Sequence, residues 1–485
     1  MGTEEPPIQT PAAPLAPSRF NGPLIMTACL AIGQLVGLGR NILVSRSLGT
    51  EIQGQAMVIG LVSGFFLSIF TLNAAWQLVQ SQHGEDPRFQ SSLQGTAILR
   101  GLIASVVLAV TTYFVLPIFG FADLRGPMIL TASIPLLEGL IHLDAWRDLR
   151  NRLFRKVAFI ELSGSLTSTL AAIIALAFIR SIWVVPIVAV ANSLGRVFIS
   201  HLVAVSTWRV RLHTHHLREI FWFTLPLLPA GFLFWVNTQS DRMVIILSEK
   251  ISWLPSLDLK SLGAYGTVAV IVLLPRGTIV KTMQSIVIPG IAATKSTPER
   301  CAKQFSIFLF WTTLLAAAIA FTGGLVGDLV FLLVLGDAFK AGASVAPFLI
   351  VAMGVQLIRT ACYSTSTGLG HNSTSLTGNI ARLAGLPLAI IALWADFGLL
   401  GLAVSVVIAE LLASAVAGLW QQRFLPSSFL PVVLSLTALA IISAIGVLLQ
   451  QTITSEGIRV GLATTVLLAA GVALLQWRRQ SRPSG

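Results

Sequence analysis

Charged side chains are scarce in this sequence. Asp, Glu, Lys and Arg make up 11% of its 485 residues, whereas 55% are hydrophobic. Soluble domains carry about 25% charged residues. No polar stretch between the apolar segments is longer than a loop, so the chain has no room for a large soluble domain. The composition therefore predicts an all-α polytopic membrane protein.

Cysteine and acidic residues are also few. Cys29, Cys301 and Cys362 are too widely spaced for a disulfide framework or a metal site, so neither is expected. The 20 acidic residues face 32 basic ones, which leaves a net charge of +12. In a membrane protein this excess reflects basic cytoplasmic loops and attraction to anionic lipid. Membrane lipids, and no nucleic acid, are the expected partners.

Catalytic patterns are missing. The sequence contains no phosphate-binding GxxxxGK[ST], no zinc-binding HExxH and no nucleophile elbow. Its loops are too short to house an ATPase. The chain is therefore predicted not to be an enzyme and to use no cofactor. Any transport would draw on an ion gradient, the membrane potential or the gradient of the cargo.

Apolar stretches of about 20 residues, the length that crosses a bilayer, predict fourteen membrane helices. Their expected spans are 22–45, 54–80, 92–118, 126–146, 157–179, 183–208, 219–248, 263–290, 303–326, 343–367, 374–396, 399–421, 428–450 and 458–477. The apolar piece 328–335 is too short to cross and is expected to be re-entrant or interfacial. Residues 1–19, which are proline-rich, and 479–485 are expected to be cytoplasmic tails.

The basic residues outside these spans alternate in number from one side to the other. With the N-terminus inside, 17 of them fall on the cytoplasmic side and 7 on the opposite side. Cytoplasmic loops are enriched in Lys and Arg. Both termini are therefore predicted to be cytoplasmic.

Two six-helix blocks resemble each other. The span 22–45 begins GPLI and carries Arg40–Asn41 near its end, and 219–248 contains LPLL and carries Asp241–Arg242. AAIIAL at 171–176 and LAIIAL at 388–393 recur in the same order. We therefore expect two pseudo-symmetric lobes, 20–210 and 211–425, followed by two C-terminal helices within 426–478. Blocks with an even number of helices share one orientation, and a substrate would lie between them.

The first span has one polar side. Gln34 and Asn41 stand seven residues apart and share a stripe of the helix, with Gly33, Gly37 and Arg40 beside it. Lipid cannot satisfy such a polar stripe, so it is expected to face protein or water. Two interpretations of Arg40 are open: it lines a central cavity, or it extends to the nearer membrane interface.

Basic residues outnumber acidic ones within the predicted spans. The basic residues are Arg40, Arg100, Arg196, Arg242, Arg276, Lys281, Arg359 and Arg382, and the acidic residues are Glu138, Asp144, Glu161, Asp241 and Glu410. Each charge at the bilayer centre costs about 2.5–3.5 kcal/mol on insertion scales. The positive excess therefore indicates an anionic cargo, and Arg suits phosphate because its planar fork binds two oxygens.

Other interpretations apply to several of these charges. Arg100, Arg382 and Asp144 lie near helix ends, from which they could reach the membrane interface. Arg196, Arg276 and Glu410 lie near mid-span and could form structural ion pairs. Asp241 and Arg242 are adjacent on one helix, so each is expected to find a partner on another helix.

The fourth span suggests a proton site. Glu138, His142 and Trp146 follow one another at intervals of four residues, which places them on one face of a continuous helix. A carboxylate beside an imidazole can exchange a proton at physiological pH. The alternative is a satisfied polar pair that packs the lobe.

Three segments resemble Wzx-type polysaccharide flippases of the multidrug/oligosaccharidyl-lipid/polysaccharide exporter superfamily. They are LVGLGRNILVSRSLGTEIQGQ (35–55), FWVNTQSDRMVIILS (234–248) and LGAYG (262–266). The resemblance extends over about residues 20–425. It implies a V-shaped pair of lobes around a cationic cavity. The implied activity moves an undecaprenyl-diphosphate-linked oligosaccharide across the bacterial inner membrane by alternating access, for surface polysaccharide synthesis.

This resemblance assigns roles to the polar residues of the spans. Arg40, Arg196, Arg242, Arg276 and Arg359 would bind the diphosphate. Gln34, Asn41, Asn237 and Gln239 would bind sugars, and Glu138, His142, Asp241 and Glu410 would couple an ion. The expected partners are the polyprenyl-diphosphate-linked glycan, a polysaccharide polymerase and glycosyltransferases. The protein itself is expected to be a monomer.

Three rival functions remain open. In the related lipid II flippase an arginine would be expected where Gln34 stands, which counts against lipid II as cargo. Drug exporters of the superfamily often use an acidic residue in the first helix, and this first helix has none. A membrane scaffold would have no use for so many mid-span arginines, because each costs insertion energy.

Overall fold

The computed structural model describes residues 21–70, 74–81, 83–151, 153–225, 227–371, 373–426 and 428–480. The predicted tail 1–19 and nearly all of 479–485 lie outside these ranges. Helices dominate the described residues, which contain no β-strand. The protein is therefore an all-α polytopic membrane protein, as the composition predicts.

The helices follow one another with short connections. They are α1 (Asn21–Phe70), α2 (Ala74–Gln80), α3 (Pro87–Ile118), α4 (Arg125–Thr131), α5 (Ile134–Leu140), α6 (Asp144–Arg150), α7 (Arg155–Phe178), α8 (Val184–Leu202), α9 (Thr214–Thr224), α10 (Leu227–Ser248), α11 (Leu259–Thr294), α12 (Pro298–Leu335), α13 (Lys340–Ala343), α14 (Ala346–Gly368), α15 (Ser373–Arg382), α16 (Gly385–Trp394), α17 (Gly398–Gln421), α18 (Phe429–Thr452) and α19 (Glu456–Gln480).

Twelve helices of the described chain are long and apolar enough to cross a membrane, and a bent pair formed by α4–α5 and α6 raises the number to thirteen. Helix α1 is itself a hairpin of two spans. Its helical geometry breaks at Gly49, where φ is 77°, and Met26 and Phe70 from its two ends line the same cavity. Glycine adopts this positive φ without strain. Counting α1 as two spans accounts for the difference from the predicted fourteen.

Two predicted elements are wrong. The piece 328–335 is not re-entrant but the last part of α12, because 303–335 contains no proline to end the helix. The fourth span is not one helix, since it divides into α4, α5 and α6 with a 53° bend before α6. Ile141 is extended there, with φ −61° and ψ 128°.

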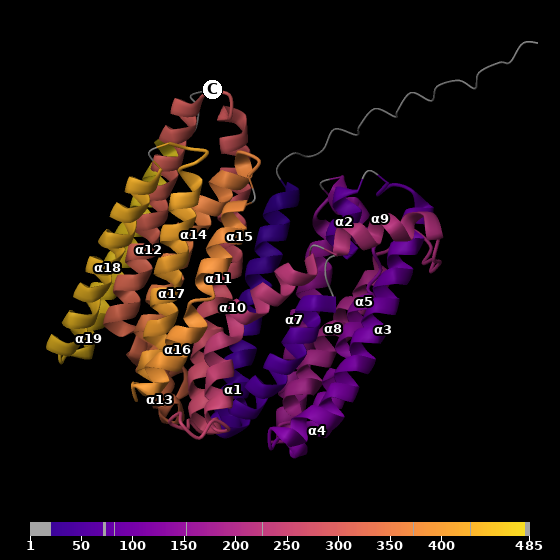
Figure 1. The fold of residues 1–485 in the computed structure, drawn as a ribbon, viewed down its shortest axis with the longest axis horizontal. Helices are drawn as coiled ribbons and strands as arrows, with labels where there is room; N and C mark the ends of the chain where they lie inside the picture. The colour runs from indigo at the N-terminus through magenta and orange to yellow at the C-terminus, as the bar shows by residue number, and fades with distance from the viewer. Residues whose placement is uncertain are drawn as a thin grey trace, which may run out of the picture.

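The helices form two bundles that diverge from each other (Figure 1). We call the bundle of α1 to α9 the N-lobe and the bundle of α10 to α19 the C-lobe. The lobes meet at one end of the molecule, where Gly54 of α1 approaches Leu259 of α11, and separate toward the end at which α1 begins (Figure 1). Buried apolar residues of both lobes join them, including Val58 of α1, Ile245 of α10 and Tyr265 of α11.

Glycines make the junction of the lobes close. A Cβ atom on Gly54 of α1 would overlap the carbonyl oxygen of Leu259, and one on Gly263 of α11 would overlap that of Thr50. Helix α11 begins here at Asp258, whose carboxylate accepts a hydrogen bond from the backbone amide of Ser261 (2.9 Å). Hydrogen bonds with the hydroxyl and then with the backbone amide of Ser261 lower the pKa of Asp258. At this end of the molecule the two helices therefore touch backbone to backbone.

Helix α9 lies on the N-lobe, although residues 211–425 were assigned to the second lobe. Glu219 accepts a hydrogen bond from Ser81 (2.7 Å) and lies 3.0 Å from His83. His216 lies 3.5 Å from Asp86. These contacts hold α9 beside α2 and α3 (Figure 1), so the chain passes to the C-lobe only after α9.

Candidate functional site

A cavity of about 510 Å³ lies between the lobes. Both halves of α1, together with α5 and α8, line it from the N-lobe, and α10 and α11 line it from the C-lobe. Five residues singled out in the sequence meet there: Arg40, Asn41, Glu138, Gln239 and Arg242. Four residues predicted for substrate binding, together with Glu138, which was predicted for ion coupling, therefore converge from both lobes.

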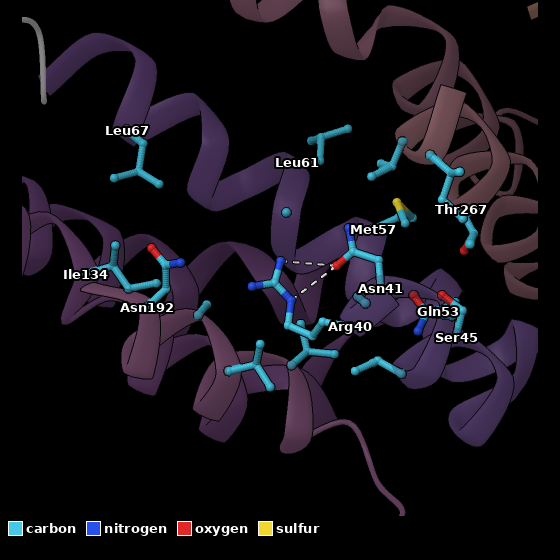
Figure 2. A pocket seen from close by; sticks show the side chains of 18 of the residues that line it. Arg40, Asn41, Ser45, Gln53, Met57, Leu61, Leu67, Ile134, Asn192 and Thr267 are labelled. Carbon is cyan, nitrogen blue, oxygen red and sulfur yellow. Dashed lines mark hydrogen bonds between the residues drawn. The ribbon is translucent and has the colours of Figure 1, made fainter. Parts of the chain in front are cut away.

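Arg40 lies in the wall of this cavity (Figure 2). Its guanidinium donates hydrogen bonds to Oδ1 of Asn41 (3.2 Å) and to the hydroxyl of Ser168 on α7. The side chain is half-buried and directed by these contacts. The structure thus favours the cavity interpretation of Arg40 over extension to the membrane interface.

Arg242 approaches from the C-lobe. Its guanidinium donates to Oε1 of Gln239 at 2.7 Å, and both residues line the cavity. The carboxylate of Asp241 accepts a hydrogen bond from the hydroxyl of Tyr265 on α11 (2.8 Å). Asp241 thus has a partner on another helix, as expected, whereas Gln239, to which Arg242 donates, lies on the same helix as Arg242.

Arg196 joins two carboxylates into a cluster that we call the N-lobe triad: Glu138, Glu161 and Arg196. Nη1 of Arg196 lies 2.7 Å from both oxygens of Glu138, and Nη2 lies 2.9 Å from Glu161. Ser193 donates to Glu138 at 3.0 Å. All three members of the triad line a second cavity of about 330 Å³, and Glu138 lines both cavities.

Glu138 and His142, which were expected to lie on one helix face, do not pair with each other. The helix breaks between these residues, because α5 ends at Leu140 and α6 begins at Asp144. Nδ1 of His142 instead accepts a hydrogen bond from the backbone amide of Asp144 (3.1 Å). His142 therefore caps the break, and the partner of Glu138 is Arg196.

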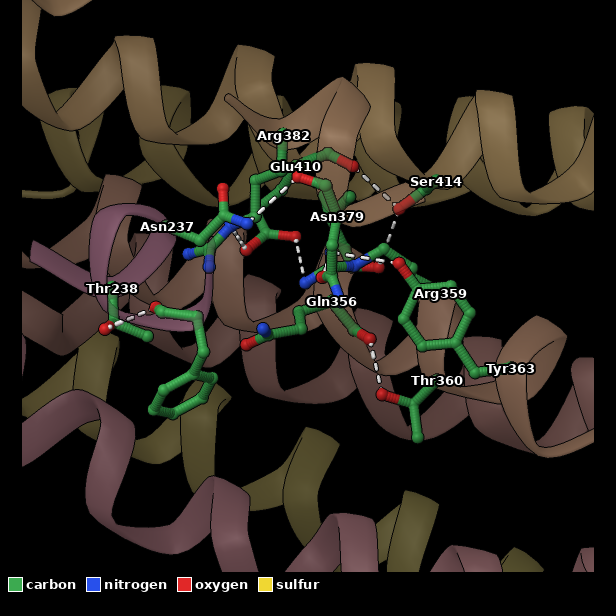
Figure 3. A network of polar contacts seen from close by, with 12 residues as sticks. Asn237, Thr238, Gln356, Arg359, Thr360, Tyr363, Asn379, Arg382, Glu410 and Ser414 are labelled. Atoms are coloured by element: carbon green, nitrogen blue, oxygen red, sulfur yellow. Dashed lines mark hydrogen bonds and ion pairs between the residues drawn. The ribbon is translucent and has the colours of Figure 1, made fainter. Parts of the chain in front are cut away.

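A second charged cluster, the C-lobe triad, lies inside the C-lobe and consists of Arg359, Arg382 and Glu410 (Figure 3). Arg359 lies 3.0 Å and Arg382 2.6 Å from Glu410. The side chains of Arg359 and Glu410 are 4% and 2% exposed, so this is a buried pair. Arg382 does not extend to the interface, since Glu410 holds it inside.

The remaining predicted residues do not reach the central cavity. Asn237 is buried and donates to the backbone carbonyl of Asn379 (2.9 Å). Arg276 lies within electrostatic range of the C-lobe triad. Gln34 is exposed and outside the central cavity. Of the residues predicted for substrate binding, Arg40, Asn41, Gln239 and Arg242 line the cavity, and Asn237, Arg276 and Arg359 lie in the C-lobe. Arg196 belongs to the N-lobe triad, and Gln34 is exposed.

Several polar residues of the cavity wall were not predicted: Ser45, Gln53, Asn192, Ser193 and Thr267. A sequence signal existed for Asn192, because it precedes Arg196 by four residues and shares its helix face. Ser193 could be found only through its contact with Glu138, which depends on the packing of α8 against α5.

A family model described as "Polysaccharide biosynthesis protein" matches residues 43–344. The chain belongs to this family. The match covers most of the segments in which the resemblance to polysaccharide flippases was seen and confirms that resemblance. A search among curated proteins gives no match.

Solved structures of transporters share the fold of this polysaccharide biosynthesis protein. A lipid II flippase MurJ in an inward closed conformation is 14% identical, with a TM-score of 0.71 over 93% of this chain and 99% of that one. An inward-facing multidrug resistance MATE family transporter of the MOP superfamily is 14% identical, with a TM-score of 0.62 over 84% and 99%. A MOP superfamily transporter from Pyrococcus furiosus is 16% identical, with a TM-score of 0.56 over 84% and 94%.

The chain is therefore a multi-pass membrane protein of the polysaccharide biosynthesis family, with a fold that solved transporters share. Both agree with a chain in which polar residues converge on a cavity between two helical lobes. At these identities the solved structures establish the fold alone.

Proposed function

We propose that this protein flips an undecaprenyl-diphosphate-linked oligosaccharide from the cytoplasmic to the outer leaflet of the bacterial inner membrane. The observation that carries the proposal is the meeting of Arg40 and Arg242, one from each lobe, in one cavity. Two guanidiniums facing a common space bind a diphosphate well, because each can donate to two phosphate oxygens.

The charge of the cavity wall distinguishes this cargo from a drug. The described lining contains two arginines and one carboxylate, and that carboxylate, Glu138, already faces Arg196. A hydrophobic cation would meet an excess of positive charge there. The amides of Asn41 and Gln239 supply donors and acceptors that suit sugar hydroxyls. A diphosphate with its first sugars therefore fits the wall better than an organic cation does.

The size of the cavity indicates which part of the substrate it can hold. A volume of about 510 Å³ lies within the range of about 300–1,000 Å³ that is typical of small-molecule sites. It suits the diphosphate and the nearest sugars but not a polyprenyl chain. The chain would remain in the lipid beside the lobes.

The closed end gives the transport cycle a direction. With both termini in the cytoplasm, the backbone contacts at Gly54 and Gly263 close the outer side, and the lobes diverge toward the cytoplasm. We propose that this conformation receives the glycan lipid and that rocking of the lobes then opens the outer side. Glycosyltransferases would act before the monomeric flippase, and a polymerase would act after it.

Depletion of the protein in its host tests the proposal. Undecaprenyl-linked oligosaccharide should accumulate on the cytoplasmic leaflet, with loss of surface polysaccharide, and its mass would identify the glycan. Accumulation of lipid II would instead assign the lipid II function. Normal glycan lipids together with greater sensitivity to cationic drugs would contradict the proposal in favour of an exporter.

A further inference from the structure

The two triads occupy matching places but carry opposite charge patterns. Glu161 follows Glu138 by 23 residues, and Arg382 follows Arg359 by the same interval. In the N-lobe two carboxylates share one arginine, whereas in the C-lobe two arginines share one carboxylate. One cluster therefore has a formal charge of −1 and the other of +1.

Their surroundings also differ. The side chains of Arg196, Glu138 and Glu161 are 20%, 22% and 38% exposed and lie at two cavities. The members of the C-lobe triad are at most 12% exposed. Glu138 lines the central cavity and also the second cavity, which Arg196 and Glu161 line, so the triad is open to water and to a diphosphate that extends from the first cavity into the second. The members of the C-lobe triad are enclosed by protein.

We propose that Arg196 exchanges its carboxylate partners for the diphosphate, and that Glu138 or Glu161 takes up a proton when this happens. This inference rests on the proposed function. In the substrate-free protein the carboxylates neutralise Arg196. When the diphosphate arrives, its oxygens accept the hydrogen bonds of Arg196, and the displaced carboxylate binds a proton from the cytoplasm. Release reverses both changes, so no covalent bond other than O–H forms or breaks.

Electrostatics explains why a proton accompanies the exchange. A diphosphate brings about two negative charges next to two carboxylates, and like charges at close range favour protonation of one of them. The cations around the triad are Arg40 on α1, Arg100 on α3, Arg242 on α10 and Lys281 on α11, and His142 lies four residues beyond Glu138. These cations stabilise the carboxylates when the site is empty and interact with the diphosphate when it is bound.

The C-lobe triad is not suited to this exchange. Protonation of Glu410 would take from Arg359 and Arg382 the carboxylate that both pair with, in a buried site. The inverted pattern therefore confines proton uptake to the N-lobe. The charge of the C-lobe triad thus stays positive, while the charge of the N-lobe triad changes when the substrate binds.

Binding of farnesyl diphosphate to the purified full-length protein, measured by calorimetry between about pH 6 and pH 8, tests the exchange. Uptake of one proton weakens binding about tenfold for each unit by which the pH rises. We expect Glu138→Gln to bind more tightly than the unsubstituted protein near pH 8 and to lose most of this slope. Glu161→Gln should behave in the same direction, and Arg196→Ala should bind at least tenfold more weakly.

Asp328→Asn is the matched control, since Asp328 pairs with Arg459 (2.6 Å) between α12 and α19, away from the triad. It should keep the unsubstituted slope, which includes the titration of the ligand itself. Equal slopes in all variants, or unchanged binding in Arg196→Ala, would overturn the exchange while leaving the flippase proposal intact. If the unsubstituted protein did not bind the probe, the flippase proposal itself would be contradicted.

A second measurement does not depend on any variant folding correctly. Addition of farnesyl diphosphate to the unsubstituted protein in weak buffer should raise the pH reported by an indicator dye, in proportion to the bound ligand. Binding without this rise would overturn the exchange.

Discussion

Arg40 and Arg242 reach one cavity from different lobes, and a neighbouring amide directs each of them. An arginine held in this way pays less entropy when it binds a phosphate than a free side chain does. The positions of these two arginines thus explain how a positive cavity can be specific for a diphosphate. Removal of either arginine should affect the cargo before it affects the fold.

We expect Arg40→Ala to reduce flipping at least tenfold, because one of the two phosphate-binding forks is lost, while the protein still inserts. Accumulation of glycan lipid in the host measures the effect. Arg46→Ala is a suitable control, since Arg46 is exposed and lies outside the cavity. Full activity in Arg40→Ala would remove Arg40 from the site.

Replacement of Glu410 tests whether the C-lobe triad stabilises the fold. Glu410→Gln removes the carboxylate that pairs with two buried guanidiniums and should destabilise the protein by about 3–5 kcal/mol. A lower thermal unfolding temperature in detergent would show this. Arg382→Gln should cost less, because the pair of Arg359 with Glu410 at 3.0 Å remains. If both variants unfolded at the unsubstituted temperature, the triad would not be structural.

At the scale of elements, the hairpin of α1 and the start of α11 form the closed end of the molecule. Thr50 and Gly54 on one side meet Leu259 and Gly263 on the other, with no space for a Cβ atom. Such contacts form only when the lobes are together. The glycines therefore determine the stability of one conformation more than that of the fold.

Gly263→Ala should shift the protein toward a state that is open at this end. Spin labels at Glu51 and Lys260, whose side chains approach to 3.9 Å, should show a longer distance than in the unsubstituted protein. Gly39→Ala is the control, because a Cβ there meets no atom within 4 Å. An unchanged distance in Gly263→Ala would show that the helices adjust without opening.

At the scale of the whole molecule, the direction of transport depends on the orientation in the membrane. The excess of basic residues on one side predicts that both termini are cytoplasmic. Green fluorescent protein fused to the C-terminus should therefore fluoresce, and alkaline phosphatase fused there should be inactive. The reverse result would invert the proposed conformation and require the lobes to open outward.

Composition and apolar length were enough to predict the helical membrane fold, because a bilayer admits few other structures. The mid-span positive excess also predicts an anionic cargo, and this stays a prediction. Arg40, Asn41, Gln239 and Arg242 could be selected from sequence because polar residues on a membrane helix need a polar neighbour.

The tertiary structure alone decided which polar residues meet. Helical periodicity placed Glu138 beside His142, but the helix is interrupted at Ile141, which separates the two side chains. Glu138 instead pairs with Arg196, 58 residues away. The partners of Glu410 likewise come from two other helices. Ion pairs between helices depend on how the bundles pack, and the local periodicity of one helix carries no information about that packing.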